Sequence, residues 1–300
     1  MSDSSNQNVI SPLAFSTVAC PEWGMEQVVA AAVEYGYQGV ELRTFGAGSS
    51  QLGCDPALSD PDKVRYLFEK ASLQVACLAT SVALHFRGKA EAAQALASAR
   101  SFVDMAARLD CPRIRTFGYM IYPGEVPATA VRRLAGRYLE LAEYAEESGV
   151  EIVIENAGSF ARSRELWNLT NSTGHPLVGV CWNVAYAATV GERPGLSVTT
   201  LNSRIRYAKV KDTVIGEGTG YCPLGEGSVE VERFVELMRG IGYSGWLCFE
   251  WDKLWLPSLA GPQEALPKAR ERLSEWMRLK VDKKGKPLAK REAAVLEVRR

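Results

Sequence analysis

The stretch that decides the fold is residues 146–155, EESGVEIVIE, in which a helical pattern ends at a glycine and an apolar strand begins directly afterwards. Glycine readily adopts the left-handed conformation that commonly ends a helix. Residues 34–42, EYGYQGVEL, and residues 240–250, GIGYSGWLCFE, repeat this junction. The chain therefore alternates helices with strands.

Eight short apolar or β-branched runs recur along the chain, and helical patterns lie between them. The runs are residues 13–19, 39–43, 74–84, 113–118, 150–155, 177–182, 205–211 and 246–250. Two of the intervening stripes have the 3.6-residue helical spacing: Val131, Leu134, Ala135, Tyr138, Leu141, Ala142 and Ala145, and Val231, Phe234, Val235, Met238 and Ile241. Asp60 and Pro61 predict the N-cap and first residue of another helix.

Eight βα units with strands that are apolar on both faces predict a single-domain (β/α)8 barrel, or TIM barrel. An open doubly wound sheet is the alternative. We expect a flexible N-terminus over residues 1–10, the barrel over 11–280 and a basic C-terminal tail over 281–300, broken by Gly285 and Pro287. A solvated tail is favoured over one that contacts nucleic acid or membrane.

Composition excludes several classes of protein. The 300 residues are 47% hydrophobic, and 35 basic side chains balance 35 acidic ones, so no global field favours nucleic acid or a membrane surface. The first residues do not resemble a signal peptide, and no apolar run approaches the roughly 20 residues that span a bilayer. Seven cysteines without a C-x-x-C spacing indicate a reducing, cytoplasmic setting.

Candidate functional residues are the polar ones that end the strands, because a TIM barrel carries its chemistry at that end. They are Glu41, Arg43, His85, Glu155, Asn156, Asn183, Lys209, Lys211 and Glu250. Glu155 and Glu250 each follow an apolar strand, where a carboxylate is costly without a partner or a task. Two carboxylates on opposite sides of a substrate suit proton removal and return. An ion pair that closes the barrel is the alternative, and for Glu41 a pair with Arg43 is favoured.

The chain resembles the xylose-isomerase-like TIM-barrel family of sugar isomerases and epimerases. The resemblance is carried by residues 11–43 and 223–259, most specifically by LGEG at 224–227 with GYSGWLCFE at 242–250, and is supported by KVKD at 209–212. It implies a divalent ion held by Glu, Asp, His and Glu at the ends of strands five to eight. Glu155 and Glu250 match the two glutamates.

The other two metal ligands are replaced in this chain. The resemblance maps Asn183 onto the Asp, Lys209 onto the His, Tyr186 onto a substrate-contacting His and Leu256 onto a further His. Two glutamates, a neutral Asn and a protonated Lys carry a net charge of −1, as the metal-loaded set does. We expect Lys209 to occupy the place of the ion and no cofactor to be needed. The alternative is a weakly held Mn, Mg or Zn ion on Glu155, Asn183 and Glu250.

These features together predict a sugar or polyol isomerase or epimerase that transfers a proton next to a carbonyl group. Glu155, Glu250 and Lys209 are the predicted catalytic residues, with Lys209 acting electrostatically. The predicted substrate contacts are Asn183, Tyr186, His85, Glu41, Arg43, Lys211 and Trp182. Trp251 and Trp255 either stack on a sugar or pack the rim. We expect a small-molecule sugar as partner and a possible homo-oligomer.

A non-catalytic protein that binds a carbohydrate-like ligand or another protein is the alternative function. The loss of two metal ligands agrees with this alternative almost as well. The glycines of residues 216–227, GEGTGYCPLGEG, are a weak signal for a phosphate group on the substrate, because in the family they mostly form a turn.

Overall fold

The computed structural model describes residues 11–216 and 220–278. Its eight long strands are parallel and close into a barrel in the order β1-β10-β7-β6-β5-β4-β3-β2. The predicted (β/α)8 barrel is thereby confirmed. The predictions for residues 1–10 and 281–300 concern segments that lie outside the described residues.

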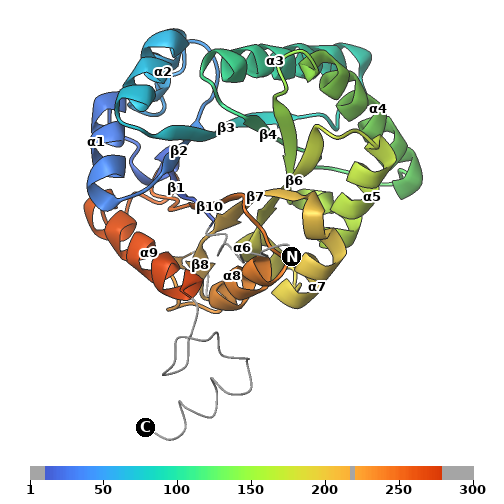
Figure 1. Ribbon diagram of the computed structural model, residues 1–300. Coiled ribbons are helices and arrows are strands. Elements are labelled where there is room, and N and C mark those ends of the chain that lie inside the picture. Colours follow the sequence, from blue (N-terminus) through green and yellow to red (C-terminus); the bar gives the residue numbers. More distant parts are fainter. Residues whose placement is uncertain (1–10, 217–219, 279–300) are drawn as a thin grey trace, which may run out of the picture.

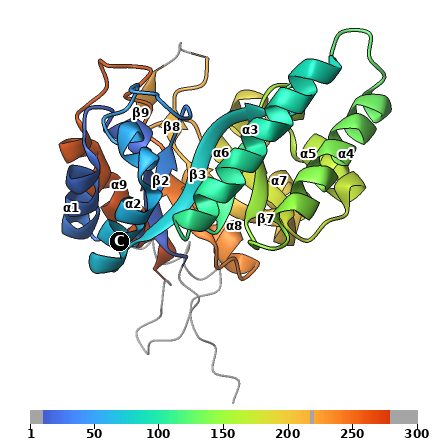
Figure 2. The same ribbon diagram turned by 90° about the horizontal axis from the view of Figure 1, so that it is seen from above.

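The barrel strands correspond to the eight predicted runs. They are β1 (Leu13–Ser16), β2 (Gly39–Arg43), β3 (Gln74–Ala83), β4 (Arg113–Phe117), β5 (Glu151–Glu155), β6 (Val178–Asn183), β7 (Ile205–Val210) and β10 (Trp246–Phe249). A small antiparallel ribbon of β8 (Asp212–Thr213) and β9 (Tyr221–Cys222) follows β7. Figure 2 shows this ribbon at one end of the barrel.

Helices follow the strands and form a ring around the barrel (Figure 1). They are α1 (Met25–Tyr35), α2 (Pro61–Lys70), α3 (Lys89–Arg108), α4 (Pro127–Ala145), α5 (Ser163–Thr173), α7 (Pro194–Leu201), α8 (Val231–Gly240) and α9 (Pro262–Met277). The short helix α6 (Val184–Thr189) directly follows β6 and lies inside this ring in Figure 1. The last helix, α9, packs beside α1 and completes the ring. Within the described residues, none of these helices has the length and apolarity to cross a membrane.

The helix ends confirm the turn signals in the sequence. Gly36, Gly149 and Gly242 have φ values of 75°, 69° and 75°, in the left-handed region that favours glycine. The Asp60 carboxylate accepts a hydrogen bond from the Lys63 amide at 3.2 Å, as an N-cap does. One residue of the predicted stripes was misplaced. Ile241 lies beyond the end of α8 and is 40% exposed.

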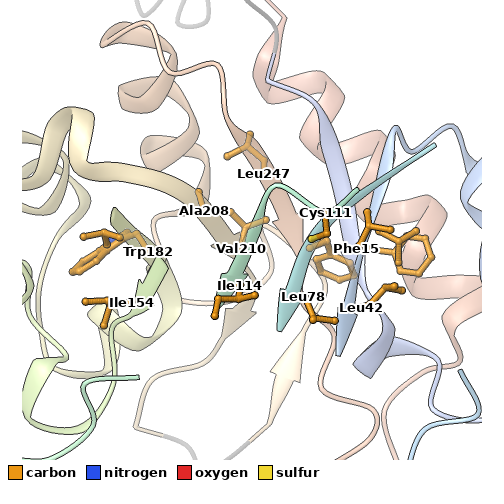
Figure 3. Packing of buried hydrophobic residues seen from close by; sticks show 14 of the residues in the cluster. Phe15, Leu42, Leu78, Cys111, Ile114, Ile154, Trp182, Ala208, Val210 and Leu247 are labelled. Carbon is orange, nitrogen blue, oxygen red and sulfur yellow. The ribbon is translucent and has the colours of Figure 1, made fainter. Parts of the chain in front are cut away.

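Two layers of side chains pack against the two faces of the barrel sheet. The larger layer lies between strands and helices and includes Phe15, Leu42, Leu78 and Trp182 (Figure 3). A smaller cluster comes from six different strands and fills the barrel interior. It comprises Ala14, Ala76, Cys77, Val153, Cys181, Tyr207, Trp246 and Cys248.

Strand periodicity places the polar residues above this interior cluster. Side chains alternate between the two faces of a strand, so residues two apart share a face. Val153, Cys181 and Cys248 point inward, and therefore Glu155, Asn183 and Glu250 also point inward, one step nearer the C-terminal end. By the same rule, Lys209 points inward because Tyr207, two residues before it on β7, points inward. The register of β6 and β7 pairs Asn183 with Lys209 directly.

Candidate active site

Lys209 is the centre of the site. Its side chain has no exposed surface, and its Nζ lies 3.1 Å from Glu41 Oε1 and 3.6 Å from Glu155 Oε2, and in direct contact with Glu250 Oε2. These carboxylates come from β2, from β5 and from the residue after β10. Three acidic side chains from separate parts of the barrel therefore converge on one ammonium group. The structure places Lys209 between Glu155 and Glu250, as expected for an internal cation.

Lys211 provides a second buried cation nearer the barrel mouth. Its Nζ lies 2.6 Å from Glu250 Oε1 and 2.7 Å from Asp252 Oδ2. The rings of Tyr186 and Tyr221 flank this nitrogen, with centroids 4.4 Å and 4.6 Å away. Lys211 has no exposed surface, so its predicted contact with substrate stays a prediction that requires a rearrangement of these tyrosines.

Asn183 connects two of the carboxylates. Its Nδ2 donates to Glu155 Oε1 at 3.0 Å and to Glu250 Oε1 at 3.3 Å. Its Oδ1 accepts from the Tyr186 amide at 3.4 Å and thereby caps α6. An aspartate here could not donate to either glutamate. The Asn183 side-chain amide therefore suits a site whose central cation is the Lys209 ammonium group.

Arg115 belongs to the site although the sequence analysis did not identify it. Its Nε forms an ion pair with Glu155 Oε2 at 3.0 Å, and its Nη1 donates a hydrogen bond to the Thr80 carbonyl at 2.7 Å. The signal was present in β4, where the alternation in RIRTF turns both arginines inward. Asp252 and Tyr221 were also missed, because Asp252 lies three residues beyond the end of β10 and Tyr221 lies in β9, outside the barrel.

The predicted pair between Glu41 and Arg43 is wrong in this structure. Glu41 pairs with Lys209, whereas Arg43 donates to the carbonyls of Thr44 and Ala79 and to Ser81 Oγ. Burial and the nearby Arg115 charge lower the pKa of Arg43 to about 10. Glu41 reaches Lys209 because an inward-pointing side chain on β7 crosses the barrel to β2.

The charge balance also differs from the prediction. The expected value of −1 counted two glutamates and one lysine. The buried cluster contains four carboxylates, Glu41, Glu155, Glu250 and Asp252, and four cations, Arg43, Arg115, Lys209 and Lys211. Its formal charge is therefore zero. The predicted value did not include the cations Arg43, Arg115 and Lys211 or the carboxylates Glu41 and Asp252.

The pKa values follow from this pairing. Burial would lower the pKa of Lys209, but the surrounding carboxylates outweigh it and hold the pKa well above its usual value. Lys211 behaves in the same way. Burial would raise the pKa of Glu250, but Lys209 and Lys211 hold it well below its usual value. Burial and the Glu250 charge raise the pKa of Asp252.

His85 and Trp182 lie away from this cluster. His85 packs among Phe86, Tyr119 and Tyr122, and burial with nearby arginines lowers its pKa. Its contact with substrate stays a prediction. The prediction for Trp182 is wrong, because this side chain is buried between strands and helices (Figure 3). Asn183 points inward, so its neighbour on the strand must point outward.

The donor set does not fit a divalent ion in this arrangement. The Lys209 ammonium lies between the two glutamates, and Asn183 turns its NH2 group, not its oxygen, toward them. Asn183 Oδ1 already accepts from the Tyr186 amide. Within residues 11–216 and 220–278, no group of three or more His, Cys, Asp or Glu side chains could hold a metal ion. A cation on Glu155, Asn183 and Glu250 would require Lys209 to leave.

Comparison with known proteins identifies the family. The protein-family model described as xylose isomerase-like TIM barrel matches residues 29–278 of this chain. The chain belongs to this family. For this xylose isomerase-like TIM barrel, the assignment of Glu155, Asn183, Lys209 and Glu250 to the metal-ligand positions of the family stays a prediction. No curated protein sequence matches the chain.

Solved structures show the same fold at low sequence identity. The IolI protein with a bound zinc atom superposes with a TM-score of 0.76 at 15% identity, covering 89% of this chain and 98% of the other. L-ribulose 3-epimerase gives 0.76 at 15% identity, with coverages of 96% and 98%. D-allulose 3-epimerase from Methylomonas sp. gives 0.71 at 16% identity, with coverages of 89% and 98%. At these identities the likeness establishes the barrel alone.

Proposed function

We propose that the protein is an isomerase or epimerase of sugars or polyols that moves a proton on the carbon next to a carbonyl group. The observation that carries the proposal is the position of the Lys209 ammonium between Glu155 and Glu250 at the C-terminal end of the barrel. This end holds the active site in TIM-barrel enzymes. The names of several solved neighbours, L-ribulose 3-epimerase and D-allulose 3-epimerase among them, support sugars as the proposed substrate class.

Lys209 is the electrostatic centre of the proposed reaction. Its raised pKa keeps it protonated, which suits a hydrogen-bond donor and opposes a Schiff-base role, since that role needs a lowered pKa. The ammonium stabilises the negative charge that develops on the carbonyl oxygen when the neighbouring proton is removed. A cation about 4 Å from such an oxygen contributes on the order of 4 kcal/mol at an effective dielectric near 20, before desolvation.

Glu155 and Glu250 exchange the proton. In the free protein, Glu250 is a weak base because two lysines hold its pKa low. Movement of Lys209 from Glu250 toward the substrate oxygen removes part of that influence and makes the carboxylate more basic as the reaction starts. Lys209 is fully covered in the free protein, so substrate entry displaces side chains above it, among them the tyrosines that flank Lys211.

The test is solvent deuterium incorporation. A panel of unphosphorylated ketoses is incubated with the protein in deuterated water, and exchange at the carbon next to the carbonyl is followed by NMR. We expect exchange with the wild-type protein and its loss in Glu155→Gln and Glu250→Gln. Glu264→Gln, an exposed site on α9, is the control and keeps the activity. Exchange that persists in both site variants contradicts the proposed roles.

A binding protein without catalysis is the second candidate. It is favoured by the complete burial of Lys209 and Lys211 and by the zero formal charge of the cluster, which together describe a closed ionic core. The distinguishing result is stabilisation by a ketose in a thermal melt without any deuterium exchange.

The proposal also covers the cellular location and the oligomeric state of the protein. We place the protein in the cytoplasm, because all seven cysteines are free thiols and six of them are buried. The predicted homo-oligomer stays a prediction, which light scattering of the purified protein tests.

A further inference from the structure

Trp255 differs from the other tryptophans in its exposure. It is 53% exposed in the loop after β10, whereas the six others are buried or half-buried. An exposed indole offers a large, rigid apolar face that a ligand can cover. The loop that carries Trp255 follows β10, and Glu250 of the candidate site lies directly after the same strand.

The loop that carries Trp255 is held in place by hydrogen bonds. Lys253 Nζ donates to the carbonyls of Pro257 at 2.9 Å and Leu259 at 2.6 Å, and the Leu254 amide donates to the Val18 carbonyl at 3.0 Å. The Trp255 amide donates to the Asp252 carbonyl at 3.0 Å. The indole is therefore presented by an ordered backbone, which reduces the entropy lost when a ligand binds.

Trp255 forms an aromatic pair with Phe45, here called the rim pair. The ring centroids are 5.8 Å apart and the planes meet at 78°, in an edge-to-face arrangement. Phe45 follows β2 and Trp255 follows β10, and β1 lies between these strands in the barrel. The pair therefore joins the loops after β2 and β10, the two strands that flank β1.

The rim pair is continuous with the ionic cluster on both sides. The Arg43 guanidinium lies 4.1 Å from the centroid of Phe45, and Arg43 is buried beside the carboxylates of the cluster. Asp252, three residues before Trp255, binds Lys211 at 2.7 Å. The rim pair is therefore linked to the cluster by Arg43 through space and by Asp252 along the chain.

We infer that the rim pair is a stacking subsite for the C–H face of a carbohydrate ring, with Trp255 as the contact surface. This inference rests on the proposed function and names the part of the ligand that the rim holds. The aromatic face carries partial negative charge and attracts the weakly positive C–H groups of a sugar face. The cations of the cluster are already paired with carboxylates or carbonyls, so an uncharged ring fits this rim better than an anion.

The experiment compares wild type, Trp255→Leu and a matched control, Tyr66→Leu, which removes a 60% exposed aromatic ring from α2. Two probes are titrated against intrinsic fluorescence: the ketose panel, and methyl β-galactopyranoside, which has a flat C–H face but no free carbonyl. Urea midpoints verify that each variant is folded.

We expect Trp255→Leu to weaken binding of both probes about threefold to tenfold, the range of an aromatic contact. For a ketose that is turned over, KM rises by this factor and kcat is unchanged. Tyr66→Leu leaves both probes unaffected. Equal binding by wild type and Trp255→Leu overturns the subsite, and so does the absence of any binding to wild type.

The outcomes separate the subsite from the catalytic proposal. Weakened galactoside binding in Trp255→Leu without deuterium exchange in any ketose supports the subsite and rejects the isomerase. Deuterium exchange with an unchanged KM in Trp255→Leu rejects the subsite and keeps the isomerase.

Discussion

The Nζ atom of Lys209 lies 3.1 Å from Oε1 of Glu41, although the two residues are 168 positions apart in the sequence and both side chains are completely buried. Glu155 and Glu250 complete the surroundings of the ammonium group. A buried charge of either sign is costly alone, so these four groups depend on one another. The consequences can be measured in both stability and chemistry.

Lys209→Met removes the central ammonium and keeps the length of the side chain. We expect the free energy of unfolding to fall by about 3–5 kcal/mol, because the carboxylates around it lose their shared cation. Urea unfolding measures the change. Lys268→Met removes an exposed lysine from α9 and should leave the stability unchanged. Adding Glu41→Gln to Lys209→Met should recover part of the loss, since one unpaired charge is removed. A Lys209→Met protein as stable as the wild type would falsify this account of the site.

Asp212→Asn tests how the loop after β7 is fixed. The Asp212 carboxylate accepts from the backbone amides of Thr213, Gly225, Gly227 and Val229 at 2.9–3.1 Å. An asparagine replaces one acceptor oxygen with an NH2 group, and we expect a loss of about 1–3 kcal/mol.

Hydrogen exchange gives the local measurement for Asp212→Asn. The amides of Gly225, Gly227 and Val229 should lose protection, whereas the amides of β5 should not. The control Asp62→Asn changes an exposed carboxylate on α2 and should leave the loop amides protected. Unchanged protection in Asp212→Asn would show that the loop is held by other contacts.

The pH dependence of stability should come partly from Glu250. Its folded pKa lies below the ordinary value of 4.5, so the stability it contributes is present above that pH and is lost as pH falls toward the folded pKa. Asp252 has the opposite sign, because its pKa is raised in the folded protein and protonation there favours folding. Glu250→Gln should therefore flatten the acid limb of a stability curve, and Asp252→Asn should steepen it.

Urea unfolding between about pH 3 and about pH 8 measures both slopes. The lysine contributions lie on the alkaline side: a raised Lys209 pKa gives stability that is complete below pH 10.5 and lost as pH rises through the folded pKa. They leave the acid limb unaffected. Identical acid limbs in wild type, Glu250→Gln and Asp252→Asn would refute the assignment.

Metal binding can be tested by introducing the ligands that the family resemblance implies. The double variant Asn183→Asp with Lys209→His offers a Glu, Asp, His and Glu set in place of the organic cation. We expect Zn²⁺ or Mn²⁺ to stabilise this variant, by about 2.7 kcal/mol at a hundred times the dissociation constant.

The wild-type protein should not respond to the same ions or to EDTA in a thermal melt. Its Lys209 ammonium lies where the ion would have to bind, and displacing it leaves that charge buried. One tightly held metal per wild-type chain by elemental analysis would contradict the proposed replacement.

The sequence by itself determined the barrel and part of its polar layer. Eight apolar runs separated by helical stripes could bury their surface in few other ways, and the glycine junctions at 36, 149 and 242 indicated where β2, β5 and β10 begin. Glu155, Asn183, Lys209 and Glu250 were identified from their places at strand ends, because strand periodicity is local information.

Only the tertiary structure decided which charges meet. Glu41 has Arg43 two residues away, yet it pairs with Lys209 from across the barrel, and Arg115 joins Glu155 from the neighbouring strand. Closure of the sheet brings these side chains together, and the sequence does not encode their separations. The physical reason is that the side-chain periodicity of a helix or strand is set by near neighbours in the chain. The pairing of buried charges depends on their distances in the folded structure, which closure of the barrel sets.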